Sequence, residues 1–158
     1  MNITKIKVAG DYTATIDYQV DNDTSIEKRS FEGKEQITDD FIRAFQNTRN
    51  TFVEYLTKLK NDVHRIKPLE LKFEYKAGSL KNVAYTVCYA PTDEINTPVN
   101  ITTPKLPIWT DKAKEGTFYV SGQDIDIINE VRKFAENYIK GDTRTKQCKL
   151  EVLDGALS

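Results

Sequence analysis

Apolar and polar residues alternate with a period of two along the first third of the chain, a pattern typical of half-buried β-strands. Ile6 and Val8 alternate with lysines, and the segment 13–20 places four apolar residues on one face: Ala14, Ile16, Tyr18 and Val20. The mostly charged stretch 25–31 predicts an exposed edge strand. We therefore expect the chain to open with a three-stranded β-meander.

A helical pattern follows this meander. Thr38 is a suitable N-cap, and Asp39 and Asp40 suit the positive end of a helix. Apolar residues then recur at helical spacing: Phe41, Ile42, Phe45, Phe52, Tyr55, Leu56 and Leu59. The polar interval 46–51 interrupts this pattern and could be a kink or a break into two short helices. We favour one helical region with a kink there.

The second half repeats the order of strands and then a helix. Residues 69–75 alternate between apolar and charged, and Gly78 with Ser79 predicts a turn. Residues 82–90 are apolar on both faces, which predicts a central strand covered on both sides. Ser121 and Asp124 have the spacing of a capping box and precede an apolar stripe of period 3.6 that Gly141 ends: Ile127, Ile128, Val131, Phe134, Ala135 and Tyr138.

This order of elements predicts an α+β fold with an antiparallel sheet and helices packed on one face. Each half could be a β-meander capped by a helix. We expect a single α+β domain over residues 1–141, and residues 142–158 form a C-terminal tail or a final strand at 148–153.

Composition and charge narrow the functional classes. The formal net charge of -1 and the pI near 5.9 provide no overall attraction to nucleic acid or to an anionic membrane. No apolar run reaches the roughly 20 residues of a membrane helix, and the N-terminus lacks the apolar segment of a signal peptide. The two cysteines, Cys88 and Cys148, lie far apart, as is common in a reducing compartment. We therefore expect a cytoplasmic protein with no membrane partner.

Residues that could support catalysis are few. His64 is the sole histidine, and no nucleophile elbow, P-loop or dinucleotide-binding motif is present. Cys88 lies within an apolar strand, where an inert buried thiol is the usual outcome. The acidic pair at 39–40 and the pair Asp124 and Asp126 are explained as charges at helix N-termini. We therefore expect no enzymatic activity, no catalytic residue, no metal site and no cofactor.

Two basic clusters keep a nucleic-acid partner open. The first, in the segment 58–67, consists of Lys58, Lys60, His64, Arg65 and Lys67, interrupted by Asp62. The second follows the last helix and consists of Lys140, Arg144, Lys146 and Lys149. Such residues could contact phosphates, or they could simply be solvated.

The segment 91–110 holds four of the five prolines and the only tryptophan. Proline lacks a backbone donor, so this segment predicts an edge strand at VNITT followed by an extended arm at KLPIW. Its apolar residues could pack on their own domain or on another chain. Leu106, Ile108 and Trp109 are the candidate interface, and we expect a homo-oligomer.

Several short motifs suggest a family. The chain combines ITKIKV, DFIRAF, LELKFEY followed by a Gly turn, NTP and AENYIKG within residues 3–141. In these motifs it resembles small bacteriophage proteins of unknown function. The resemblance implies a phage or prophage origin and the cytoplasm of an infected bacterium, and it assigns no functional residues.

The leading hypothesis is a non-enzymatic, phage-derived binding protein that counteracts host defence by sequestering a small nucleotide signal or by binding a host protein. Cationic and aromatic side chains would hold the nucleotide, and the candidates are Arg65, Lys67, Tyr85, Tyr89 and Trp109. The alternative is an accessory protein of DNA replication or recombination that binds nucleic acid through the basic segment 58–67. A structural assembly protein is a third class.

Overall fold

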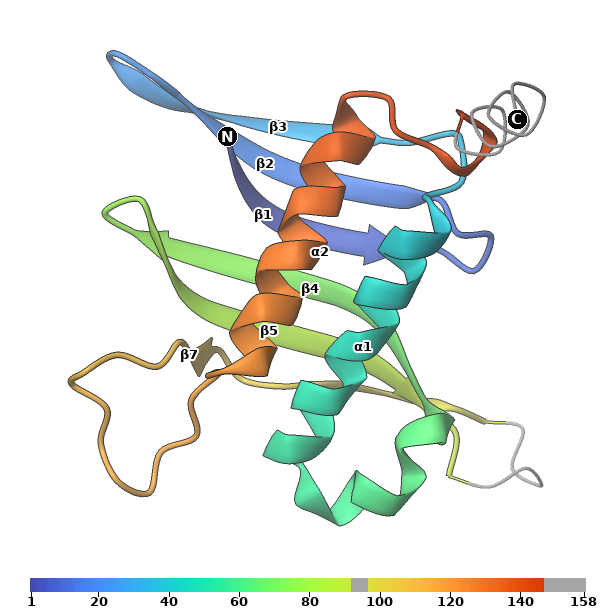
Figure 1. The fold of residues 1–158 in the computed structure, drawn as a ribbon, viewed down its shortest axis with the longest axis vertical. Coiled ribbons are helices and arrows are strands. Elements are labelled where there is room, and N and C mark those ends of the chain that lie inside the picture. Colours follow the sequence, from blue (N-terminus) through green and yellow to red (C-terminus); the bar gives the residue numbers. More distant parts are fainter. Residues whose placement is uncertain (92–96, 147–158) are drawn as a thin grey trace, which may run out of the picture.

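A computed structural model describes residues 1–91 and 97–146 (Figure 1). In chain order the elements are β1 (Asn2–Val8), β2 (Ala14–Asn22), β3 (Ser25–Glu32), α1 (Asp39–Tyr55), the 3₁₀ segment η1 (Thr57–Arg65), β4 (Ile66–Lys76), β5 (Ser79–Tyr89), β6 (Val99–Thr102), β7 (Leu106–Pro107) and α2 (Gln123–Ile139). The strands form one antiparallel sheet in the order β3-β2-β1-β4-β5-β6, and the short β7 pairs with β5. Helices α1 and α2 cross one face of this sheet (Figure 1). The predicted α+β fold with helices on one face is confirmed.

The core lies between the sheet and the two helices. Alternate residues of the central strands, among them Ile6, Ile16 and Leu71, turn toward the helices and are fully buried. Phe52 of α1 and Ile128 of α2 meet them from the other side. The period of two in the strands and the period of 3.6 in the helices therefore converge on one apolar layer.

Thr38 caps α1 as expected, since its hydroxyl oxygen accepts a hydrogen bond from the amide of Phe41 at 3.1 Å. The expected kink at 46–51 is wrong: α1 is continuous there and the chain bends only after Tyr55. Two threonines in the polar interval are buried because their hydroxyls find partners. Thr48 donates to the carbonyl of Phe45 at 2.6 Å, and Thr51 donates to Asp124 at 2.7 Å.

Two further expectations need correction. β5 is covered on one face only, because Val83 and Val87 face the helices whereas Ala84 and Cys88 face the side that no described helix covers. Ser121 does not cap α2. The cap residue is Gly122, with φ of 56° and no side-chain hydrogen bond.

The C-terminal side of the domain is only partly described. The expected final strand at 148–153 lies outside the described residues. The first residues after 141 pack back on the domain: Arg144 pairs with Asp39 at 3.0 Å, and Thr143 donates to Glu35 at 2.8 Å. The domain boundary at residue 141 stays a prediction.

The described residues 97–110 of the proline-rich segment pack mainly on their own domain. β6 forms the expected edge strand beside β5, and Leu106 pairs with Val83 and is buried. Ile108 is half-buried against the core, whereas Trp109 is 51% exposed. Of the three candidate interface residues, Trp109 alone presents most of its side chain to solvent.

Candidate functional site

A hollow with a basic lining lies where α1, η1 and β4 meet, and we call it the basic hollow. Its volume is about 440 Å³, and it is lined by Tyr12, Gln46, Arg49, His64, Arg65, Ile66, Lys67, Pro68 and Ala90. Three of these side chains, those of Arg49, Arg65 and Lys67, carry a positive charge, and among the described residues no carboxylate lines the hollow. This lining is suited to an anion.

The basic side chains of the hollow come from three elements. Arg49 projects from the middle of α1, His64 and Arg65 end η1, and Lys67 follows at the start of β4. The amide of Ala90 donates to the carbonyl of Arg65 at 3.2 Å, which ties the end of η1 to the chain beyond β5. The position of the cations therefore depends on how η1 connects the end of α1 to the start of β4, and not on local sequence alone.

The lining of the basic hollow also includes an aromatic residue, Tyr12, that is already held in place. Tyr12 has a positive φ of 64°, a conformation that residues other than glycine adopt infrequently. The guanidinium of Arg144 lies 5.4 Å from the centre of its ring, which is within the range of a cation–π interaction. The contact with Arg144 therefore restricts the position of a ring that lines the hollow.

The structure brings together only some of the residues expected to hold a ligand. Arg65 and Lys67 line the basic hollow, and Tyr89 pairs with Ile66 beside it. The hydroxyl of Tyr89 donates to Asp62 at 2.8 Å, and this hydrogen bond raises the Tyr89 pKa.

Tyr85 and Trp109 do not join this group. Tyr85 is buried under the helices. Trp109 follows β7, which pairs with the first half of β5, whereas the hollow residue Ala90 lies just after the other end of β5. Trp109 therefore lies near the opposite end of β5 from the basic hollow. The sequence analysis did not identify three residues of the hollow: Tyr12, Gln46 and Arg49. Arg49 and Gln46 lie in the polar interval 46–51, and that polarity was the one signal that could have indicated them.

A second polar cluster links α1 to α2. Asp124, in the first turn of α2, accepts the hydrogen bond from Thr51, and the carboxyl of Glu54 lies within hydrogen-bonding reach of it. That hydrogen bond, with burial and the charge of Asp124, raises the Glu54 pKa to about 7. The buried hydroxyl of Tyr85 lies beside Thr51 but makes no hydrogen bond of acceptable geometry, and burial raises its pKa. We call these four residues the acid cluster.

The acid cluster can hold a proton between two carboxyl groups.

Within the described residues, no group of three or more His, Cys, Asp or Glu side chains could hold a metal ion. In that same part of the chain no helix is long and apolar enough to cross a membrane.

Comparisons with known proteins add no family. No protein-family model, no curated protein and no solved structure matches this chain. The resemblance to small phage proteins stays a prediction.

Proposed function

We propose that this chain is a non-enzymatic binding protein that sequesters a small phosphate-bearing ligand of the nucleotide class in the basic hollow. One observation carries the proposal: four basic side chains from three different elements line one hollow of about 440 Å³, to which the described part of the chain contributes no carboxylate. They are Arg49, His64, Arg65 and Lys67. That volume lies within the range of roughly 300–1,000 Å³ typical of small-molecule sites.

The chemistry of the lining suits a phosphate group. A guanidinium presents a planar fork that matches two phosphate oxygens, and Lys67 adds a point charge. Tyr12 offers a ring face and Gln46 an amide, which suit the base of a nucleotide. In a phage-infected cytoplasm, such a protein would withdraw a host nucleotide signal and so counteract host defence.

The test is calorimetric titration of the purified protein with inorganic pyrophosphate, a nucleoside triphosphate and cyclic dinucleotides. We expect at least one nucleotide to bind, and Arg49→Ala or Lys67→Ala to weaken its binding at least about tenfold. Arg43→Ala is the matched control, because Arg43 is an exposed arginine of the same helix that pairs with Asp40 at 3.5 Å. Absence of binding by every probe, or an equal loss in Arg43→Ala, would contradict the proposal.

Nucleic-acid binding is the second candidate function. The observation in its favour is that Lys58 and Lys60, both exposed on η1, extend the basic surface beyond the hollow. For this function, binding of a single-stranded oligonucleotide should weaken steeply with salt, and Lys58→Ala with Lys60→Ala should reduce that dependence. A mononucleotide that binds without a change in these variants would favour the first candidate.

Self-association forms part of the proposal through Trp109. Trp109→Ala should convert an oligomer to a smaller species in light-scattering measurements, if this exposed ring forms the contact. A protein that remains monomeric at high concentration would contradict this part alone.

A further inference from the structure

The sheet has an open seam at its centre, on the side of the molecule away from the basic hollow. β1 pairs with β4 at three positions, and this pairing ends at Lys5 with Lys72. Beyond that point the hydroxyl of Tyr75 donates to the carbonyl of Ile3 at 2.6 Å, and the Arg132 guanidinium of α2 donates to the same hydroxyl at 3.1 Å. Tyr75 and Arg132 therefore close the seam on the helix side and leave it open on the other.

Two adjoining hollows follow this seam on the uncovered face. The first has a volume of about 590 Å³ and the second about 350 Å³, and they share Thr4, Asp17, Phe73 and Glu74. Their linings include residues of β3, β2, β1, β4 and β5, so together they form one trough that crosses five neighbouring strands. We call it the seam trough.

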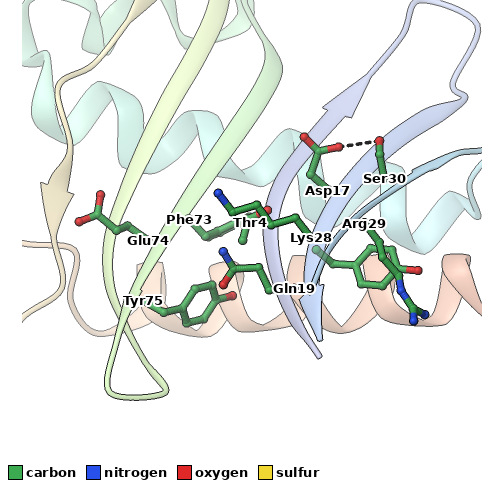
Figure 2. Close-up of a pocket in the computed structure, with 10 residues that line it drawn as sticks. Thr4, Asp17, Gln19, Lys28, Arg29, Ser30, Phe73, Glu74 and Tyr75 are labelled. Atoms are coloured by element: carbon green, nitrogen blue, oxygen red, sulfur yellow. Dashed lines mark hydrogen bonds between the residues drawn. The ribbon is translucent and has the colours of Figure 1, made fainter. Parts of the chain in front are cut away.

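Polar side chains extend into the seam trough over an aromatic floor. Figure 2 shows Gln19 and Tyr75 pointing toward one another, with Thr4 and Lys28 beside them. Phe73 lies at the bottom and is almost fully buried. Neutral amides and hydroxyls of this kind match the N–H and C=O groups of a polypeptide backbone.

The charge of the seam trough is mixed but mainly positive. Five of its lining side chains are cationic and two are carboxylates. Asp17 already accepts a hydrogen bond from Ser30 at 2.7 Å, and Glu74 pairs with Lys105 at 2.6 Å. Lys28 and Lys72 form no ion pair with any described residue.

We propose that the seam trough is a docking site for an extended acidic segment of a partner protein. Unpaired ammonium groups would meet its carboxylates, and Gln19 and Thr4 would meet its backbone. The fixed carboxylates Asp17 and Glu74 disfavour a nucleic-acid backbone, which carries a negative charge on every unit, more than a peptide whose acidic residues alternate with neutral ones. This site goes beyond the proposed nucleotide function and is independent of it, because the basic hollow lies at the opposite end of β4.

The width of the seam trough sets the length of the segment. Five neighbouring strands at a spacing of about 4.8 Å span about 19 Å, and an extended chain covers that distance with about six residues at roughly 3.3 Å each. The probe is therefore a capped hexapeptide of alternating glutamate and threonine, and the matching lysine–threonine hexapeptide is its control.

The experiment is a titration of isotope-labelled full-length protein followed through backbone amide chemical shifts. We expect the acidic hexapeptide to shift the amides of Thr4, Gln19 and Lys28, and the lysine peptide to leave them unchanged. Lys28→Glu or Lys72→Glu should weaken binding at least about tenfold. Lys7→Glu is the matched control, because Lys7 is exposed on the same face outside the trough and should bind as the parent protein does.

Three results would overturn the proposal. One is an absence of shifts at millimolar peptide. Another is an equal loss in Lys7→Glu, which would indicate general charge attraction. The third is tighter binding of a thymidine hexanucleotide at the same amides, which would assign the trough to nucleic acid.

Discussion

Replacement of Glu54 by Gln should make the stability of this protein less dependent on pH. In the acid cluster the Glu54 carboxyl lies against Asp124, so its pKa rises from 4.5 to about 7. The protonated form can donate a hydrogen bond to the Asp124 carboxylate, and the ionised form repels it. Because the folded pKa exceeds the unfolded one, the stabilisation is complete below pH 4.5 and is lost as the pH rises to about 7.

The magnitude follows from the shift and from the exposure of Glu54. At full burial, a change of this size corresponds to about 3 kcal/mol. Glu54 is largely exposed, and solvent screening reduces the expected loss to about 1 kcal/mol. Among the described groups that face Glu54, Asp124 supplies the charge, and Tyr85 stays neutral because burial raises its pKa. Glutamine keeps a donor for Asp124 and cannot ionise.

Urea unfolding at pH 5 and pH 8 measures the effect. We expect Glu54→Gln to match the parent protein at pH 5 and to exceed its free energy of unfolding by about 1 kcal/mol at pH 8. Glu130→Gln is the control, since Glu130 is exposed on α2 and outside the acid cluster. A stability difference between Glu54→Gln and parent that is the same at both pH values would refute the reasoning, as would a Glu54 pKa below 5 from carboxyl chemical shifts.

Four further substitutions test the packing. Leu106→Ala should lower the free energy of unfolding by about 2–4 kcal/mol through a core cavity, whereas Trp109→Ala should cost less than about 1 kcal/mol because its ring is largely exposed; equal losses in urea unfolding would contradict the core position of Leu106. Gly33→Ala should cost more than about 2 kcal/mol, because the added Cβ would lie 1.9 Å from the Tyr138 hydroxyl oxygen; an unchanged melting temperature would contradict that close approach. Tyr85→Phe should preserve the stability or raise it by up to about 1 kcal/mol, because its buried hydroxyl has no hydrogen-bond partner; a large loss would indicate a partner for that hydroxyl.

Local sequence patterns correctly predicted the strands and helices that bury one face in the core and expose the other to solvent. Ile6 and Ile16 alternate with polar neighbours in strands, and Ile128 and Val131 belong to a helical stripe, so each pattern states which face is buried. The pattern gave wrong predictions where a polar residue is buried or an apolar residue lies on the uncovered face of the sheet. Thr51 is polar and fully buried because Asp124, 73 residues away in sequence, accepts its hydrogen bond. Ala84 and Cys88 are apolar and face the uncovered side of the sheet, which made β5 resemble a strand covered on both faces.

The candidate sites were harder to predict because their residues meet only through the sheet order. In the sequence, Arg65 and Lys67 form part of a basic segment. The neighbouring residues do not indicate whether such a segment is simply solvated or lines a hollow. The order β3-β2-β1-β4-β5-β6 places β4 beside β1, and η1 leads the chain from the end of α1 to the start of β4. Arg49 of α1 then lines the same hollow as the residues at the start of β4. The same adjacency creates the seam trough, since β1 pairs with β4 for only three residues before the two strands part. Both candidate sites are therefore consequences of one non-local pairing, at opposite ends of the same strand.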